Sequence, residues 1–502
     1  MTAIVIGAGF GGLAAAVRLR ALGHDVCLLE AQDQLGGRAR VFEQGGFTFD
    51  AGPTVVTAPY LIAELFERVG RDPRDYYELA PVDPYYRVRF PDGDTFDYVG
   101  DEERLLEQID RFHPPDVAGY RRLAEASRRI FEVGYQQLAD VPFDRLSEML
   151  RVVPQMLRLK SYRSVHGLVA QHIADPRLRQ VFTFQPLLVG GNPFDTTSIY
   201  LLIHWLERRW GVHYPRGGTG ALVRALGTLL EDIGVDLRTG TPVAEIEVEG
   251  GRAVAVHTEG GERLPCDLVV SNADPSVVYP RLIAARHRHT NTDRRVARVN
   301  QSMGLFVGYF GARGTWPDLA HHTILLGPRY RGLLDDIFHR KVLAEDFSLY
   351  LHAPGRTDPS LAPAAHDGFY VLSPVPNLRG DVDWSTAAEP YLDRILDHLD
   401  GTVLPGLRER LVTRFSVDPR YFAGALRSAD GAAFGPQPVL TQSAWFRYHN
   451  RSEDIGGLYF VGAGTHPGAG LPGVLCSAKV LERILPPASR PAAMPIARSM
   501  GA

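Results

Sequence analysis

Three glycines near the start of the chain have the spacing of a dinucleotide-binding turn. Gly7, Gly9 and Gly12 lie in "AIVIGAGFGGLAAAVRL", between a short apolar stretch and a run rich in alanine and leucine. The first glycine permits a tight turn, the second lets a pyrophosphate approach the backbone, and the third lets helix and strand pack closely. The N–H groups at the start of the helix would hold the phosphates. The pattern predicts dinucleotide binding; a glycine-rich turn in an unrelated α/β unit is the alternative.

An acidic residue follows this turn at the position of a ribose ligand. Glu30 ends the next apolar stretch, roughly 20 residues after Gly12, as in dinucleotide-binding units. Its carboxylate would accept hydrogen bonds from a ribose diol and disfavours a 2′-phosphate, so NADP is not expected. Phe10 and Gly11 lie within the same turn and are predicted to contact the cofactor.

A second pair of glycines favours FAD over NAD. "LGGRARVFEQGGFTFDAGPTV" places Gly37 and Arg38 soon after Glu30 and then returns through alternating apolar residues to Gly52, Pro53 and Thr54. This arrangement resembles the glycine-pair signature of the FAD amine-oxidase-like superfamily. Arg38 is predicted to contact the pyrophosphate, although it could also be a surface charge.

The glycines of "VGAGTHPGAGLPGVLCSAK" follow an apolar strand, "GLYF", near the end of the chain. Backbone without side chains can approach the edge of an isoalloxazine ring. A helix that starts at Pro472-Gly473 would direct its positive end at the flavin N1/C2=O edge and stabilise the reduced, anionic flavin. The predicted cofactor contacts here are Gly462, Ala463, Gly464, Gly470, Pro472, Gly473 and Val474. The superfamily usually has an acid just after this strand, and that contact must be replaced or lost.

The elements that position these residues predict an α/β fold. We expect a Rossmann-like FAD-binding domain of the glutathione-reductase type, a mixed-sheet substrate domain and a helical, membrane-associating subdomain. Val243, in "TPVAEI", is predicted to place its backbone against the adenine. The predicted domains are 1–80, 214–295 and 446–485 for FAD, 81–213 for the helical region, 296–445 for the β-rich substrate domain, and 486–502 for a disordered tail.

Basic, aromatic and apolar residues alternate in two helical segments, 146–173 and 198–212. Such helices can lie in a membrane interface; a surface helix packed on the core is the alternative. The sequence contains no run of 18 apolar residues, so a membrane-spanning helix is not expected.

Composition excludes other classes of function. The net charge of −4 and the isoelectric point near 6.5 provide no basic surface for nucleic acid. Three scattered cysteines form neither a zinc motif nor a disulfide framework and indicate a reducing, cytoplasmic compartment. His321 and His322 are adjacent, and neighbours on a strand face opposite sides, so no metal site is expected.

Nearly the whole chain resembles the bacterial-type phytoene desaturases of carotenoid synthesis. The resemblance is carried by "VIGAGFGGLAAAVRL", "GFTFDAGPTV", "QPLLVGGNPFDTTSIY", "WGVHYPRGGTGALV", "HHTILLGPRY", "AEDFSLYLHAP", "PVLTQSAWF" and the C-terminal glycine segment. It implies FAD-dependent desaturation of phytoene toward lycopene and peripheral attachment to the inner face of the cell membrane. Cys476 departs from the family pattern, which often has glycine there.

The implied chemistry is hydride transfer from an allylic carbon to flavin N5, with loss of a proton from the neighbouring carbon. If a carbocation forms first, a weak carboxylate or water is a sufficient base. No catalytic residue is therefore assigned, and Glu148 is only a weak candidate. Because the sequence contains one complete dinucleotide fingerprint, we expect oxygen or a quinone, and not a nicotinamide, to take the electrons. Alternative functions are a carotenoid 3,4-desaturase, a diapophytoene-type desaturase, or a non-redox prenyl-binding escort protein.

Overall fold

A parallel five-stranded sheet joins the beginning, middle and end of the chain. The structure is a computed structural model that describes residues 1–485 and 487–488. The strand order is β19-β13-β1-β2-β9, and each adjacent pair is parallel. The strands are β1 (Thr2–Ile6), β2 (Asp25–Leu29), β9 (Asp236–Arg238), β13 (Leu268–Ser271) and β19 (Leu458–Phe460). The predicted α/β nucleotide-binding fold is confirmed. Most of the tail predicted to be disordered, 486 and 489–502, lies outside the described residues.

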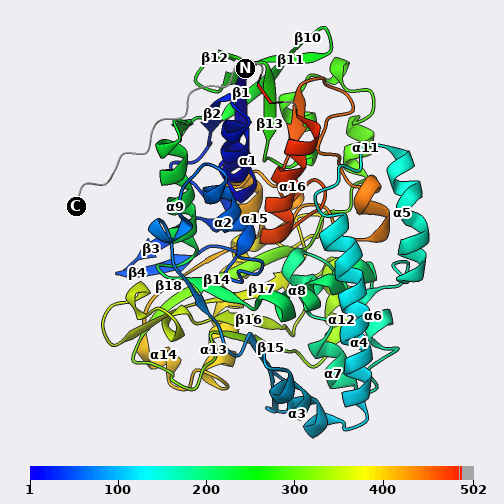
Figure 1. Ribbon diagram of the computed structural model, residues 1–502. Helices are drawn as coiled ribbons and strands as arrows, with labels where there is room; N and C mark the ends of the chain where they lie inside the picture. Colours follow the sequence, from blue (N-terminus) through cyan, green and yellow to red (C-terminus); the bar gives the residue numbers. More distant parts are fainter. Residues whose placement is uncertain (486, 489–502) are drawn as a thin grey trace.

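Helices cover one face of this sheet and a small sheet covers the other. The first face is covered by α1 (Phe10–Ala21), α2 (Tyr60–Glu67), α9 (Thr219–Asp232) and α16 (Leu471–Ile484). In Figure 1 the blue α1 and the red α16 lie side by side, and the two helices are in contact. The second face packs on β10 (Val243–Glu249), β11 (Arg252–Thr258), β12 (Arg263–Pro265), α10 (Pro275–Leu282) and the nearby α11 (Asp293–Ala297).

A seven-stranded sheet forms the second unit, below the first in Figure 1. Its order is β18-β14-β17-β16-β15-β6-β7, antiparallel except for the β15–β6 pair. The strands are β6 (Tyr86–Arg89), β7 (Thr95–Tyr98), β14 (Gly304–Arg313), β15 (His322–Leu325), β16 (Leu349–His352), β17 (His366–Val375) and β18 (Leu411–Val417). The four runs predicted as strands are β14 to β17. Aromatic and aliphatic residues of one face pack under α13 (Trp384–Asp400) and α14 (Leu407–Arg410).

The region predicted to be helical begins with strands. β6 and β7 form a hairpin around "PDGD" and complete the edge of the seven-stranded sheet. Two short antiparallel pairs connect the units, namely β3 (Val41–Gln44) with β4 (Phe47–Asp50), and β5 (Leu79–Pro81) with β8 (His213–Pro215). The alternating apolar residues of "YYRVRF" were the signal for a strand here.

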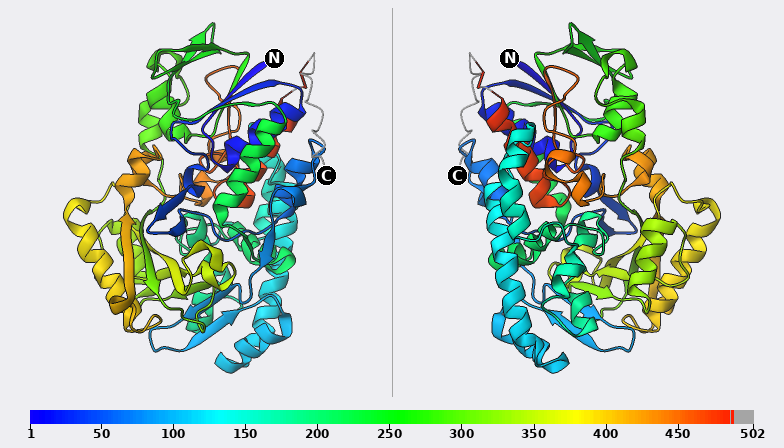
Figure 2. Two further views of the ribbon diagram at one scale, coloured as in Figure 1. Left: turned by 90° about the vertical axis from the view of Figure 1, so that its left-hand side faces the viewer. Right: turned by 90° about the vertical axis from the view of Figure 1, so that its right-hand side faces the viewer.

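The helical region forms a column along one side of the molecule (Figure 2). It contains α3 (Glu102–Phe112), α4 (Asp116–Phe131), α5 (Leu146–Arg158), α6 (Val165–Val169), α7 (Pro176–Val181) and α8 (Leu202–Trp210), while α12 (Tyr330–Asp335) and α15 (Pro419–Gly424) come from the substrate domain. In the segment 198–212, α8 packs Leu206 and Glu207 against the core, which fits the alternative of a surface helix, and its contact with a membrane stays a prediction. None of the described helices combines the length and the apolar character needed to cross a bilayer.

Candidate active site

A continuous cavity of about 570 Å³ extends from the nucleotide domain to the substrate sheet. Both glycine-rich ends of the chain and the apolar side chains of the helical region line it. The predicted cofactor residues that line it are Gly7, Gly9, Phe10, Gly11, Glu30, Gly37, Arg38, Gly52, Pro53, Thr54, Val243, Ala463, Gly470, Pro472, Gly473 and Val474. The structure therefore brings together residues that are more than 400 positions apart in the sequence.

Gly12, Gly462 and Gly464 lie behind the cavity wall. A Cβ atom on Gly12 would lie 1.9 Å from the carbonyl oxygen of Gly7, and one on Gly464 would lie 2.6 Å from Cδ of Pro275. A Cβ atom on Gly462 would lie 2.6 Å from Oδ1 of Asn272. These three glycines permit close backbone packing, which holds the cavity-lining turns in place.

Two helix N-termini open onto the cavity. Gly9 precedes α1 and Gly470 precedes α16, and neither N-terminus has a side-chain cap among the described residues. The first N–H groups of both helices are therefore available to a ligand, and the positive ends of the helix dipoles favour negative charge. The α1 end fits a pyrophosphate and the α16 end fits the polar edge of a flavin.

The Glu30 carboxylate sits at the end of β2 and already has two backbone partners. The N–H of Ala8 donates to its Oε2 at 2.7 Å, and the N–H of Gln32 donates to its Oε1 at 2.9 Å. A carboxylate has about four acceptor sites, so each oxygen keeps one for a ribose hydroxyl. The predicted role of Glu30 fits this geometry.

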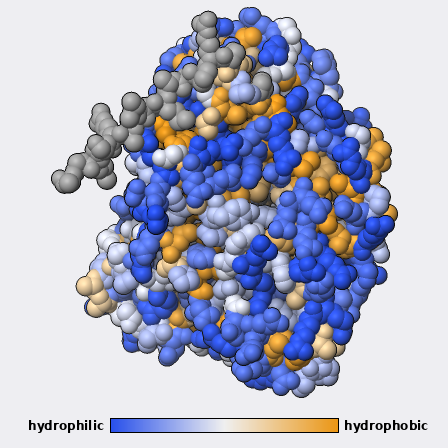
Figure 3. Space-filling model, viewed as in Figure 1, coloured by the Kyte–Doolittle hydropathy of each residue, from blue (hydrophilic) through white to orange (hydrophobic). Residues whose placement is uncertain are grey.

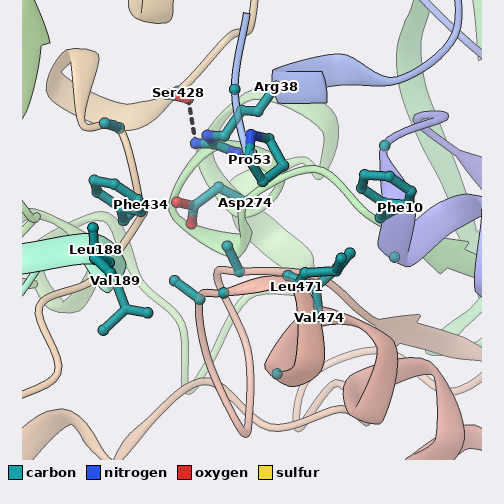
Figure 4. Close-up of a pocket in the computed structure, with 18 of the residues that line it drawn as sticks. Phe10, Arg38, Pro53, Leu188, Val189, Asp274, Ser428, Phe434, Leu471 and Val474 are labelled. Carbon is teal, nitrogen blue, oxygen red and sulfur yellow. Dashed lines mark hydrogen bonds between the residues drawn. The ribbon is translucent and has the colours of Figure 1, made fainter. Parts of the chain in front are cut away.

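Arg38 and Asp274 face one another across the cavity wall (Figure 4). The Arg38 guanidinium donates to the Ser428 hydroxyl at 2.7 Å, and burial lowers its pKa. Asp274 follows β13, and burial raises its pKa, with smaller opposing effects of the Ser276 N–H and Arg38. Among the described residues, Asp274 Oδ2 and Arg38 Nε have no hydrogen-bond partner. Buried polar atoms without partners are rare and indicate a missing ligand.

Asp274 was not among the residues predicted from the sequence, and its carboxylate lies beside the glycine loop that follows β19. Its Oδ1 is 3.2 Å from the position of a Cβ on Gly464, so the carboxylate lies against the C-terminal glycine loop. Its position after an apolar strand could have indicated it, because the parallel strands β13 and β19 pair and their carboxyl ends meet at one edge of the sheet. Ligands of open α/β sheets bind at that edge.

The far part of the cavity is apolar. Its walls include Leu187, Leu188, Leu334, Ile337, Met149 and Met156. Leucine, isoleucine and methionine offer no hydrogen-bonding groups, so this part can hold a hydrocarbon but not a polar substrate.

One carboxyl group interrupts this apolar lining. Glu207 on α8 is buried, and burial raises its pKa to about 8, with smaller opposing effects of the nearby Tyr86 and Gln185 side chains. The Tyr86 hydroxyl donates to Glu207 Oε1 at 2.7 Å. In the sequence, "LERRW" has the polar character of a solvent-exposed helix face. Glu207 is nevertheless four residues after Ile203, so both lie on the same face of α8, and both line the cavity. Glu148, the weak candidate from the sequence, is not among the lining residues.

Cys476 faces the protein core. The side chain is buried among α1, α2 and Tyr135, and it does not line the cavity. Burial raises the pKa of its thiol to about 12. The departure from the family pattern therefore affects packing behind α16 and not the surface that lines the cavity. All three cysteines are free, as expected.

The expected separation of His321 and His322 is wrong. Their ring centroids are 4.4 Å apart, and His352 joins them because it pairs with His322 across β15 and β16. His321 precedes the first residue of β15, so the strict alternation of a strand does not apply to it. The three rings are buried, and burial lowers their pKa values, His321 to about 3.

The fold and the cavity together define a flavin-dependent oxidoreductase that uses FAD. The chain belongs to the family of flavin containing amine oxidoreductases, which matches residues 10–479. Within this family it groups with the phytoene desaturases. It is 50% identical to the lycopene-forming phytoene desaturase of Pantoea ananas, over 96% of this chain and 98% of that protein. Identity to the neurosporene-forming phytoene desaturase of Rhodobacter capsulatus is 43%, over 97% and 94% of the two chains.

Solved structures share the fold at low identity. An oxidoreductase from Methanosarcina mazei has a TM-score of 0.64 and 18% identity, over 96% of this chain and 100% of that one. Cyclohexylamine oxidase from Brevibacterium oxydans has a TM-score of 0.63 and 17% identity, over 96% and 98% of the two chains. These similarities confirm the α/β fold with its parallel and mixed sheets.

Proposed function

We propose that this protein desaturates phytoene toward lycopene in carotenoid biosynthesis. The observation that carries the proposal is the continuous cavity, which leads from two uncapped helix N-termini into an apolar chamber. The names of the relatives, phytoene desaturases with lycopene or neurosporene as products, support the same substrate. A prenyl-binding escort would need the chamber but not both dinucleotide-binding ends.

The chain's own groups would bind and orient FAD, which supplies the acceptor for a hydride from the polyene. The start of α1 would hold the pyrophosphate, Glu30 the adenosine ribose and Asp274 the ribityl chain. The start of α16 would place its positive end toward the polar edge of the flavin and favour negative charge there. The apolar walls exclude water and align an allylic carbon with the ring.

Glu207 is positioned to take up the proton that the neighbouring carbon loses. Its pKa of about 8 lies close to neutrality, where a side chain is most effective as a general acid or base. The neutral form leaves the chamber uncharged, so that a hydrocarbon can enter without meeting a buried ion, and the carboxyl group must release its proton before it can act as the base.

The entrance of the chamber faces a membrane. Met149, Val152 and Met156 on one face of α5 line the cavity. The other face exposes Leu146, Leu150 and Leu157, which are 52%, 62% and 58% accessible. Figure 3 shows apolar residues along the edge of the molecule where Figure 1 places α5. Tyr162, Leu440 and Phe446 extend the exposed apolar surface.

Charge and substrate solubility point to the same surface. Arg145, Arg151, Arg158, Lys160 and Arg163 surround the exposed leucines and suit anionic lipid headgroups. A hydrocarbon of roughly forty carbons costs ~30 kcal/mol to expose to water, at ~0.8 kcal/mol per CH₂. Transfer from bilayer to chamber avoids this cost. We propose peripheral attachment at the inner face of the cell membrane, with oxygen or a quinone as the electron acceptor.

The deciding experiment incubates purified protein with phytoene in liposomes, with FAD present or omitted. We expect coloured polyenes only with FAD, in air or, anaerobically, with a quinone. Lipid and phytoene binding without colour would identify a carrier and contradict the proposal. The same mixture, floated on a density gradient, shows whether the protein travels with the liposomes.

A further inference from the structure

Three buried histidines converge behind the cavity wall, outside the site described above. His321, His322 and His352 are 4%, 0% and 1% accessible. One nitrogen of each ring lies within 4.8 Å of the corresponding nitrogens of the other two. Among the described residues, the Nε2 atoms of all three rings and the Nδ1 atom of His352 have no hydrogen-bond partner. Four unpartnered nitrogens in one buried place are unusual, because buried polar atoms are normally hydrogen-bonded.

Two of the rings are held in the orientation that metal ligands have. His321 Nδ1 is 2.6 Å from the Thr357 hydroxyl, and His322 Nδ1 is 2.6 Å from the Tyr350 hydroxyl. When Nδ1–H donates to these oxygens, the lone pair of each ring is on Nε2. A hydrogen bond at the second ring nitrogen fixes the tautomer and direction of metal-bound histidines.

A carboxylate lies beside the cluster. Asp50 Oδ2 is 4.0 Å from His352 Nε2. The Tyr214 hydroxyl donates to Oδ2 at 2.6 Å, and the Thr219 N–H donates to Oδ1 at 2.8 Å, so acceptor sites remain on both oxygens. The nearby Arg356 is paired with Asp367 at 2.7 Å.

We propose that His321, His322, His352 and Asp50 bind one divalent transition-metal ion, zinc foremost. Three imidazoles and one carboxylate are ligands that zinc accepts in four-coordinate sites. Zinc–nitrogen bonds of about 2.1 Å place tetrahedral ligands roughly 3.4 Å apart. The three imidazole nitrogens now lie within 4.8 Å of one another, and movement of the rings by about an ångström brings them to this spacing.

The ion has a structural role. It links β15 and β16 of the substrate sheet to β4, which leads into the FAD-binding turn. Tyr350 and Tyr370 each lie 2.9 Å, hydroxyl to hydroxyl, from Thr54, which lines the cavity. Metal binding at His322 thus holds the Tyr350 hydroxyl, and through it Thr54, in position.

Metal analysis of untagged holoprotein, produced with zinc in the medium, tests the site. We expect about one Zn²⁺ per chain, retained on dialysis against a chelator and released on unfolding. His352→Gln should abolish the bound Zn²⁺, whereas His289→Gln, which changes an exposed histidine, should retain it. Wild-type protein without Zn²⁺, or equal Zn²⁺ in His352→Gln, overturns the proposal.

Cobalt substitution gives a second readout that does not depend on the variant folding. Wild-type protein refolded with Co²⁺ and FAD should show ligand-field bands at longer wavelength than the flavin absorption, with intensities typical of four-coordination. Refolded protein that contains FAD but shows no such bands contradicts the site. Neither measurement uses desaturation, so failure here and failure of the proposed function are distinguishable.

Discussion

The buried carboxyl group of Glu207 predicts a specific dependence of stability on pH. Its pKa is raised from 4.5 to about 8, mainly because burial disfavours the ionised form. In the unfolded chain the carboxyl group ionises near its ordinary value. The folded protein therefore holds a proton that the unfolded chain releases, so this contribution to stability is lost as pH rises from about 4.5 to about 8.

The size of the effect follows from the two proton affinities. A tenfold difference in proton affinity corresponds to ~1.4 kcal/mol. The difference between 4.5 and about 8 thus corresponds to ~5 kcal/mol of unfolding free energy lost by about pH 8. Glu207→Gln removes the ionisation but keeps the size of the side chain and an acceptor for the Tyr86 hydroxyl. The variant should become more stable than wild type above about pH 7.

Urea unfolding of the FAD-bound protein, followed by circular dichroism at about pH 5, 7 and 9, measures this difference. We expect the unfolding midpoint of wild type relative to Glu207→Gln to fall steadily with pH. Glu103→Gln, which changes an exposed carboxylate on α3, is the control and should follow wild type. Parallel curves for wild type and Glu207→Gln would refute the assignment of a buried, protonated carboxyl group.

Three further predictions concern the cofactor, the membrane and the thiols. Asp274→Asn should weaken FAD binding about 10- to 100-fold, because one charge-assisted hydrogen bond is lost. Asp293→Asn, which changes an exposed carboxylate, should leave the affinity for FAD unchanged. Fluorescence titration of the apoproteins measures both affinities, and equal values would exclude Asp274 as a ligand. The double variant Leu150→Glu, Leu157→Glu should no longer float with liposomes, and its FAD content should be unchanged. Val412→Glu, which introduces the same charged side chain at an exposed residue of β18, is the control. Flotation of the double variant would rule out α5 as the attachment face. Native protein should react slowly with thiol reagents at about pH 8. The reason is that burial raises the pKa of Cys27 to about 12 and that of Cys266 to about 11, and it raises the pKa of Cys476 as well. Rapid labelling of Cys476 would show that its side chain is not enclosed.

The dinucleotide-binding unit was predictable because its signals are local. A glycine turn, the helix after it and the acid that ends the next strand lie within one short segment, and α1 and β2 follow that pattern. The C-terminal unit carries the same kind of signal, and α16 begins next to the predicted Pro472. Each glycine has a steric reason in its own backbone or in a neighbouring turn.

The residues that were missed depend on pairing between distant segments. Glu207 looks solvated in sequence, and only the packing of α8 against the chamber buries it. His352 joins His322 because β16 pairs with β15 in a register that the sequence does not specify. The β6–β7 hairpin appeared to belong to the helical region because β15, the strand that pairs with β6, is more than 200 residues away.

The arrangement of α5 connects the proposed location of the protein to its proposed chemistry. Met149, Val152 and Met156 are spaced by three and four residues, so they share one helix face, and that face lines the cavity. Leu150 and Leu157 are one heptad apart on another face, which is exposed. Only a helix that separates two apolar environments benefits from apolar side chains on both faces. Because a single helix is about 10 Å thick, the proposed attachment through α5 would let a substrate pass from the bilayer into the chamber without crossing water.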